Sequence, residues 1–470
     1  MNGDWNLAFT LHGSLFSFTI LNLPILQFTL HPSQLVVTIL EAIYTSVLRG
    51  GRRLLPLLAT GEGKLARGIR GRQGAAERLA GWAASERDSD RPLVWFHAPS
   101  VGESLQAASV MTALRSHRPE MQIAYTYFSP SAERLAPRLP ADVADYLPID
   151  LPDQLEPVLH ALDPSAIVFS KTEVWPNLTR LAASSGIPVL LLSATLPATS
   201  SRLRWPTRIL LRPAHQRLSR VGAISTDDAQ RFAILGVPRE RLSEMGDARF
   251  DQVARRAAAV DRKSPLLTDL ADPDSLTLVA GSTWPEDEDP LLAAFAGLPH
   301  TATRHRMILV PHEPLENSVR ELEQDLARNG IGHARLSRTL AEWRDAPVLI
   351  VDRVGILGEL YALADVAFVG GGFGSAGLHS VLEPAAFGVP VLFGPRHSNA
   401  READALIAAG GAFEAGDRLD LGRTLARLLT NGEARKTAGA AAAAYVARGV
   451  GAAERGAQLI EEFLPERQSA

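Results

Sequence analysis

Short apolar runs alternate with longer amphipathic stretches through most of the chain after residue 90. Each run is four to six residues long and is followed by Gly, Pro, Ser, Thr or Asp and then by a helical pattern. Runs that are apolar throughout indicate strands covered on both faces, and strands that alternate with helices indicate a parallel sheet. The predicted strands are residues 93–98, 123–127, 166–169, 189–193, 220–224, 276–280, 307–310, 348–351, 366–370 and 389–393.

A charged, aperiodic stretch at 251–275 divides these strands into two groups and is interpreted as a linker. Ten strands exceed one comfortable sheet, and 470 residues exceed one ordinary core. We therefore predict an α/β protein with two doubly wound domains over 51–255 and 270–450, and a C-terminal helix or tail over 451–470. Ligands of such sheets bind at the carboxyl ends of the strands.

The first 50 residues are hydrophobic and carry no Lys or Arg before Arg49, whereas seven basic residues lie between Arg49 and Arg72. Two apolar runs, 7–30 and 35–48, precede this cluster. A membrane-spanning helix needs about 20 apolar residues, so the first run is marginal and the second is too short alone. We predict that residues 1–50 anchor the protein to membrane lipids, as a span or peripherally, with the rest of the chain cytoplasmic. A core helix followed by a solvated basic face is the alternative.

Composition narrows the possible chemistry. The chain has 48 basic and 52 acidic residues, 46% hydrophobic residues and no cysteine. Without cysteine, a disulfide framework, a thiolate nucleophile and a Cys-ligated metal are excluded. The near-neutral charge balance argues against a nucleic-acid-binding protein, whose domains are usually strongly basic.

The strongest local signal is a glycine-rich loop, GGGFGSAG at 370–377, which follows a predicted strand. Glycines let a backbone approach a ligand closely, and the N-terminus of the next helix favours a phosphate. Glu383, early in that helix, is suited to accept hydrogen bonds from both hydroxyls of a ribose. A tight strand-to-helix turn is the alternative. The loop departs from a dinucleotide fingerprint, so NAD is disfavoured, whereas E-x-A-A-x-G-x-P-V from Glu383 resembles the nucleotide-binding end of GT-B glycosyltransferases.

A second signal, HAPSVGES at 97–104, follows the predicted strand 93–98. A carboxylate at the carboxyl edge of a sheet is well placed as a general base, which is one interpretation of Glu103. Ser100-x-x-Glu103 is also the pattern of a capping box at a helix start, so a structural role is the other interpretation. His97 is either a buried strand-end residue or a substrate contact.

These segments and others resemble the 3-deoxy-D-manno-octulosonic acid (Kdo) transferases, which build the lipopolysaccharide inner core on lipid A. The resemblance covers nearly the whole chain after residue 35 and keeps the family's order. It also includes YFSPSAER at 127–134, YLPIDLP at 146–152, TEVWPNL at 172–178, TDDAQRFAILG at 226–236, GDARFD at 246–251 and AGST at 280–283.

The resemblance implies a GT-B fold, in which two Rossmann-like domains face a cleft, preceded by an N-terminal membrane anchor. The acceptor would bind the domain at 51–255 and the donor, CMP-Kdo, the domain at 270–450. It further implies inverting transfer of Kdo to a lipid A precursor, without a metal or other cofactor, on the cytoplasmic face of the inner membrane.

The resemblance also assigns roles to residues. Glu103 matches the family's catalytic base, and Arg249 in GDARFD matches the basic residue that stabilises the departing charge. The positions at which the family binds CMP correspond to Pro311, His312, Val354, Gly355, Ile356, Ser380, Val381, Leu382 and Glu383.

Three departures from the family pattern concern the site. Lys171 stands where the family commonly has an acid, and it is one of only four lysines against 44 arginines, so we include it among the catalytic residues with its role open. His312-Glu313 stands where Arg-His is frequent, and His379-Ser380-Val381 where His-Asn-Pro is frequent.

No metal site is predicted. Asp88-x-Asp90 precedes a strand, the acids at 286–289 are ordinary for the first turn of a helix, and the twelve histidines show no H-x-x-x-H pattern. Two other functions stay open beside Kdo transfer. One is a different GT-B enzyme, acting on another sugar or acceptor or as a nucleotide-sugar 2-epimerase. The other is an inactive, membrane-attached binding protein.

Overall fold

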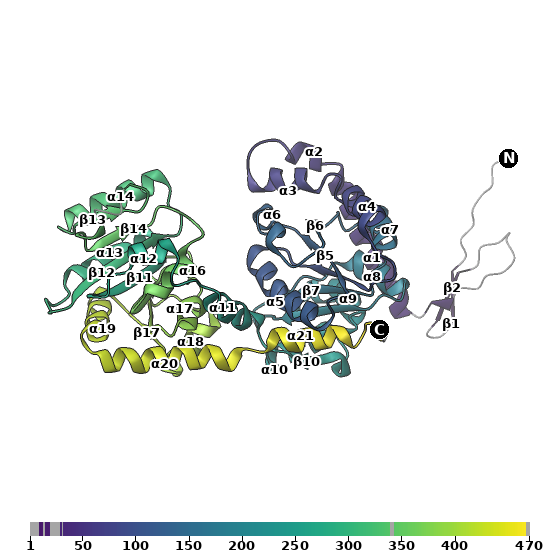
Figure 1. Cartoon of the computed structure of the whole chain (residues 1–470). Helices are drawn as coiled ribbons and strands as arrows, with labels where there is room; N and C mark the ends of the chain where they lie inside the picture. The colour runs from purple at the N-terminus through teal and green to yellow at the C-terminus, as the bar shows by residue number, and fades with distance from the viewer. Residues whose placement is uncertain (1–8, 13–14, 19–28, 31, 339–342, 467–470) are drawn as a thin grey trace. The chain divides into compact units, whose positions relative to one another are not determined.

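The computed structural model describes residues 9–12, 15–18, 29–30, 32–338 and 343–466 (Figure 1). The chain folds into two compact units. Unit 1 comprises Met1–Ala248 together with Ala452–Ala470, and unit 2 comprises Arg249–Gly451. Each unit is built on a seven-stranded sheet.

All neighbouring strands in the sheet of unit 1 are parallel. Their order across the sheet is β10-β9-β8-β7-β4-β5-β6. The chain therefore winds outward in one direction from β4 and in the other from β7, which makes the β4–β7 pair the switch point of a Rossmann-like sheet. The strands are β4 (Leu93–His97), β5 (Gln122–Tyr127), β6 (Val143–Tyr146), β7 (Ala166–Ser170), β8 (Val189–Ala194), β9 (Arg220–Ala223) and β10 (Leu242–Glu244).

Helices cover both faces of this sheet, which accounts for the mostly apolar, fully buried residues of its inner strands. On one face Met111 and Leu114 of α5 (Val101–His117) pack with buried residues of α21 (Ala452–Glu461). The stretch predicted as a C-terminal helix or tail over 451–470 thus contains a helix that belongs to the core of unit 1. On the other face lie α4 (Ala75–Glu86), α7 (Pro152–Leu162) and α8 (Pro176–Ser184).

Unit 2 has the same plan. Its parallel strands lie in the order β13-β14-β12-β11-β15-β16-β17, with the switch point between β11 and β15. They are β11 (Ser275–Thr283), β12 (Arg304–Pro311), β13 (His333–Arg335), β14 (Val348–Ile350), β15 (Val366–Val369), β16 (Val391–Phe393) and β17 (Ala412–Glu414). The helices that cover the faces include α13 (Pro285–Ala296), α14 (Glu316–Arg328), α19 (Arg418–Thr430) and α20 (Gly432–Gly449).

The prediction of an aperiodic linker at 251–275 was wrong. The segment contains most of α11 (Ala248–Ala258) and all of α12 (Pro265–Leu270). Leu267 and Leu270 are buried in a core of unit 2. The charged residues Asp261, Arg262 and Lys263 are exposed in the turn between the two helices, and Asp269 is exposed on α12.

The apolar run at 35–48 lies within α1 (Pro32–Arg52), which packs onto unit 1 by polar contacts. The Tyr44 hydroxyl donates to Asp150 at 2.9 Å, and Thr45 donates to Asn177 at 3.0 Å. A different stripe of the helix, Ile39, Ile43 and Val47, is 48%, 52% and 68% exposed. Two short helices follow, α2 (Leu55–Leu58) and α3 (Lys64–Arg72).

The predicted membrane anchor is not established by the structure. Within the ranges that it describes, no helix has the length and apolar character needed to cross a membrane. The apolar run at 7–30 lies largely outside these ranges, which hold only the short antiparallel strands β1 (Phe9–His12), β2 (Leu15–Phe18) and β3 (Thr29–Leu30) of that region.

Candidate functional site

Two charged side chains meet at the switch point of the unit 1 sheet. Glu103 lies in the first turn of α5, after β4, and Lys171 directly follows β7. The Lys171 Nζ lies 3.5 Å from Oε1 of Glu103, whose side chain is 13% exposed. The two strands are hydrogen-bonded neighbours, so their carboxyl ends bring together residues that the sequence analysis had selected separately.

Lys171 has a left-handed backbone conformation, with φ of 64°. This conformation costs a non-glycine residue about 1–2 kcal/mol. It is held by hydrogen bonds to the end of β8, in which the Lys171 amide donates to Leu192 O at 2.9 Å and Thr195 donates to Lys171 O at 3.3 Å. Strain of this kind is frequent at functional sites.

The capping-box interpretation of Ser100-x-x-Glu103 was wrong. Ser100 is the N-cap residue of α5, but its side chain accepts no hydrogen bond from a backbone amide of the helix. The hydroxyl donates to Oε2 of Glu103 instead. The Glu103 carboxylate is therefore oriented by two side chains, Ser100 and Lys171, and takes no part in a serine cap.

His97 is a buried strand-end residue. Its Nδ1 lies 3.1 Å from the Thr126 hydroxyl, and its ring meets those of Phe169 and Trp175 edge-on. Burial lowers the pKa of the His97 imidazole to about 3, because the charged form would lose its hydration. The ring is therefore neutral at physiological pH.

In unit 2 the corresponding position is organised by a carboxylate to which the sequence analysis gave no special role. Asp287, fully buried in the first turn of α13, accepts hydrogen bonds from the amides of Gly371 at 2.7 Å, Phe373 at 3.0 Å and Trp284 at 3.0 Å. It thus fastens the loop after β15 to the helix after β11. The acids at 286–289 were interpreted as ordinary helix-start residues. For Asp287 this interpretation omits its hydrogen bonds to the loop after β15.

The first three glycines of the loop are enclosed by the protein's own backbone. A Cβ atom added to Gly370 would lie 2.3 Å from a backbone atom of Ser282. A Cβ atom on Gly371 would lie 2.0 Å from the backbone of Gly377, and one on Gly372 would lie 2.6 Å from the backbone of Gly394. These glycines permit a tight strand-to-helix turn, the alternative stated above. They do not leave space for a ligand against their α-carbons.

Three aromatic rings stack beside this loop. The ring of His312, which follows β12, lies 4.7 Å from that of Trp284 and 4.3 Å from that of His379. Trp284 Nε1 donates to His379 Nε2 at 3.1 Å. Burial, and then the neighbouring His312, lower the pKa of His379. Of the three, only His312 was among the predicted site residues.

The other residues predicted to contact CMP lie around two short helices. Val354, Gly355 and Ile356 precede α16 (Leu357–Leu360), with Val354 71% exposed and open space around the Gly355 α-carbon. Ser380 is exposed just before α17 (Leu382–Ala386). Val381 and Leu382 are fully buried, so their side chains belong to the core rather than to a binding surface.

Glu383, in the first turn of α17, faces a cation that sequence reasoning missed. Nη1 of Arg256 lies 3.6 Å from its Oε1. Burial raises the pKa of Glu383, and Arg256 acts in the opposite direction. A Cβ atom on Gly358 would lie 2.6 Å from the Arg256 guanidinium, so this side chain also packs on α16. Arg256 thus lies between α16, the helix that follows the loop at 354–356, and Glu383.

Arg249 is held by an acid. Its Nη1 and Nη2 donate to Oε1 and Oε2 of Glu402 at 2.8 and 3.2 Å, and Glu402 is buried. This two-point contact fixes the direction of the guanidinium. Its role at a departing phosphate stays a prediction. In the described part of the chain no group of three or more His, Asp or Glu side chains is arranged to hold a metal ion.

We expect Asp287→Ala to lower the free energy of unfolding of unit 2 by about 2–4 kcal/mol, because leaving a buried donor unsatisfied costs about 1–3 kcal/mol. Chemical denaturation and hydrogen exchange at the amides of Gly371 and Phe373 measure the effect. Asp289→Ala, an exposed acid on the same helix, is the control and should change neither quantity. Equal stability of the two variants would contradict a fastening role for Asp287.

Comparison with known proteins identifies relatives over most of the chain. The family model described as 3-Deoxy-D-manno-octulosonic-acid transferase (kdotransferase) matches residues 73–252. A 3-deoxy-D-manno-octulosonic acid transferase of Bordetella pertussis is 30% identical over 444 residues, which cover 90% of this chain and 99% of that protein. A transferase of the same name from Chlamydophila psittaci is 30% identical over 78% of this chain and 83% of its own length.

Solved structures show the same fold at low identity. UDP-GlcNAc 2-epimerase from Neisseria meningitidis has a TM-score of 0.56 at 15% identity, covering 79% of this chain and 99% of that one. A glycosyltransferase from Rickettsia africae has a TM-score of 0.53 at 12% identity, covering 80% and 98%. These likenesses concern the fold alone and agree with two Rossmann-like units. The sequence relationship goes further, and by it the chain belongs to the 3-deoxy-D-manno-octulosonic acid (Kdo) transferase family of glycosyltransferases.

Proposed function

We propose that the protein transfers Kdo from CMP-Kdo to a lipid A precursor in the synthesis of the lipopolysaccharide inner core. Family membership supports the sugar and the reaction class. The observation that carries the proposal is the Glu103 carboxylate at the switch point of unit 1, oriented by Ser100 and Lys171 instead of closing a serine cap.

In the proposed reaction Glu103 is the general base. Its carboxylate accepts the proton of an acceptor sugar hydroxyl while that oxygen attacks the anomeric carbon of Kdo. The bond between this carbon and CMP breaks with its electron pair, so CMP leaves with the negative charge. A single displacement of this kind inverts the anomeric centre and needs no covalent sugar–enzyme intermediate.

Lys171 is proposed as a positioning residue for this base. Its ammonium, 3.5 Å from Oε1, and the Ser100 hydroxyl restrict the rotation of the Glu103 side chain. The Glu103 side chain is mostly buried, and an ionised carboxylate in such a place is costly unless it is paired. Lys171, which departs from the family pattern, pairs with Glu103. An acid at position 171 would instead repel the Glu103 carboxylate.

The donor is proposed to bind unit 2 through Pro311, His312, the loop at 354–356 and residues 380–383. Glu383 would accept hydrogen bonds from the ribose hydroxyls while Arg256 remains beside it. Arg249, directed by Glu402, would stabilise the negative charge of the departing phosphate, a role that a fixed cation can fill without a metal.

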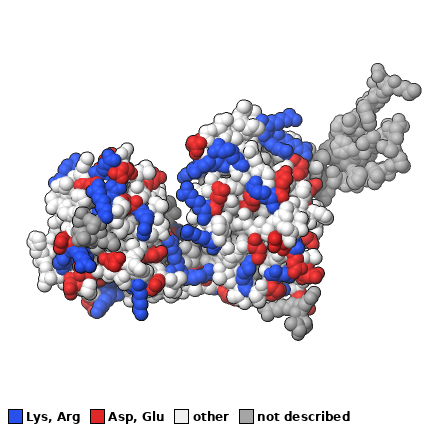
Figure 2. All heavy atoms as spheres, turned by 45° about the horizontal axis from the view of Figure 1, so that its top comes forward, with Lys and Arg blue, Asp and Glu red and all other residues white. Residues whose placement is uncertain are grey.

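Attachment to the cytoplasmic face of the inner membrane is proposed through α1, α2 and α3. The exposed stripe of α1 is continued by Leu54, Leu57 and Leu58, which are 57%, 72% and 50% exposed. Figure 2 shows basic side chains crowding the upper part of unit 1, where Figure 1 places α2 and α3. An apolar stripe flanked by arginines suits peripheral binding to anionic lipid.

The transfer assay combines purified enzyme, CMP-Kdo made in situ and a tetraacylated lipid A precursor, with product mass as the readout. We expect Glu103→Gln to fold and to bind CMP while its rate falls by about 10²–10⁴, the usual contribution of a general base. Ser100→Ala is the companion variant. Since the Ser100 hydroxyl caps no amide, this variant should melt normally and lose only a small part of the rate.

Near-normal turnover of Glu103→Gln would refute the base assignment. Absence of any Kdo-containing product from the unmodified enzyme would refute the proposed function itself.

If Glu383 holds the ribose, Glu383→Gln should weaken CMP binding by about 1–3 kcal/mol, the range for a charge-assisted hydrogen bond. Titration calorimetry with CMP measures this. Glu433→Gln serves as the control, because Glu433 is an exposed carboxylate in the first turn of another helix of unit 2. Unchanged affinity in both variants would leave Glu383 as a partner of Arg256 alone.

For membrane attachment we expect the double variant Ile43→Asp, Val47→Asp to lose at least about tenfold in partitioning to phosphatidylglycerol vesicles. Each aliphatic side chain that is buried in lipid contributes roughly 1.5–3 kcal/mol. Ile234→Asp replaces an exposed isoleucine of α10 (Thr226–Leu235) and should partition like the unmodified protein. Equal sedimentation of the three proteins would argue against this surface.

A further inference from the structure

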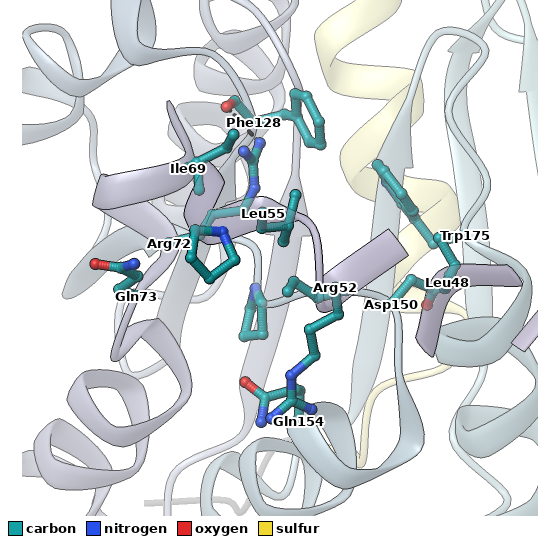
Figure 3. Close-up of a pocket in the computed structure, with 13 residues that line it drawn as sticks. Leu48, Arg52, Leu55, Ile69, Arg72, Gln73, Phe128, Asp150, Gln154 and Trp175 are labelled. Carbon is teal, nitrogen blue, oxygen red and sulfur yellow. Dashed lines mark hydrogen bonds between the residues drawn. The ribbon is translucent and has the colours of Figure 1, made fainter. Parts of the chain in front are cut away.

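Unit 1 contains a pocket of about 410 Å³ between its N-terminal helices and the carboxyl edge of its sheet (Figure 3). The volume lies in the range of small-molecule sites, about 300–1,000 Å³. One side is formed by the end of α1, by α2 and by α3, and the other by the loops after β5 and β6 and before α8. Its apolar lining includes Leu48, Leu55, Ile69, Phe128, Ile149 and Trp175.

The pocket adjoins the segment that carries the proposed base. Phe128 and Trp175, which form part of its wall, are stacked at 5.6 Å. The Phe128 amide donates to Pro99 O at 3.3 Å, in the loop that leads to Ser100 and Glu103. A molecule in the pocket would therefore contact Phe128, a residue that is hydrogen-bonded to this loop.

A cation is built into the apolar wall. The Arg72 guanidinium lies 3.5 Å above the Phe128 ring and donates to Phe128 O at 2.6 Å and Gly68 O at 3.1 Å. Across the residues that the structure describes, no carboxylate is within ion-pair distance of Arg72. Burial lowers the pKa of Arg72 to about 10, so it is still charged at neutral pH. The Arg72 guanidinium would therefore be complemented by an anionic group of a ligand.

The wall that carries Arg72 is rigid. A Cβ atom on Gly71 would lie 2.3 Å from the Tyr146 ring, so α3 packs directly on the end of β6. In the next helix, α4, Arg78 makes two hydrogen bonds, of 2.6 and 2.7 Å, to Asp145. The pocket is thus preformed, which spares a ligand the cost of ordering its walls.

We propose that this pocket binds one acyl chain of the acceptor glycolipid, with a phosphate of its headgroup paired to Arg72. The assignment rests on the proposed function, because it gives that acceptor a binding site. Apolar walls, one unpaired cation and the exposed leucines of the neighbouring α2 together favour a molecule that joins a hydrocarbon chain to an anion. A free nucleotide or sugar would leave the apolar lining without a counterpart.

The direct test is titration calorimetry with dodecyl phosphate below its critical micelle concentration. Leu55→Trp fills the pocket and should weaken binding at least tenfold, whereas Ile234→Trp, at an exposed position of α10, should bind like the unmodified protein. Leu48→Trp is the second filling variant if Leu55→Trp melts abnormally. Arg72→Gln should weaken dodecyl phosphate but leave dodecyl maltoside unchanged. Equal binding by the filling variants and Ile234→Trp would overturn the assignment.

Transfer kinetics separate this inference from the proposed function. With the acylated acceptor, Leu55→Trp should raise KM several-fold, and with a deacylated acceptor its kinetics should equal those of the unmodified enzyme. If no acceptor of either kind receives Kdo while the calorimetric pattern holds, the proposed function fails and the pocket stands. If lysophosphatidylglycerol displaces dodecyl phosphate as well as the acceptor does, the occupant is bulk membrane lipid and the assignment to the acceptor is overturned.

Discussion

The parallel pairing of β4 with β7, and of β11 with β15, is the constraint on which both candidate sites depend. In each sheet these two neighbours are the strands from which the chain winds in opposite directions, so the loops that follow them turn away from each other and leave their ends accessible. Side chains distant in sequence meet there because their strands share a ladder of hydrogen bonds. Glu103 with Lys171, and Asp287 with the loop at Gly371, are the two instances.

The loops at these edges are held by buried carboxylates. Asp150 accepts a hydrogen bond from the Leu178 amide at 2.8 Å. Asp228 accepts one from the Leu196 amide at 2.7 Å, and Asp287 accepts one from the Gly371 amide at 2.7 Å. Backbone donors that enter neither helix nor strand must still be satisfied when water is excluded, and an ionised carboxylate satisfies several at once. These carboxylates tie the loop after β6 to α8, the loop after β8 to α10 and the loop after β15 to α13.

The part of the fold that could be predicted from the sequence is the set of buried strands, because burial makes their residues apolar. All ten predicted strands exist and are the inner strands of the two sheets, whereas β6, β10, β13 and β17, which were not predicted, are the four edge strands. An edge strand is short and partly exposed, so it lacks the apolar run that reveals an inner strand. Within the site, Glu103 and Lys171 were selected, but their contact was not predictable because it depends on strand order. Asp287 and Arg256 were missed because their partners, Gly371 and Glu383, are remote in the chain.

The last helix, α21, has a consequence for how the protein is made. Ala452, Ala453, Ala457 and Ile460 of this helix complete a core whose other buried members lie between Ala75 and Ala248. Gly456 allows close contact with Val110. Unit 1 is therefore interrupted in sequence by the whole of unit 2. Domains generally fold as units while the chain leaves the ribosome. Here the unit that begins first is finished last, because the apolar face of α5 stays uncovered until α21 emerges, after all of unit 2 has been synthesised.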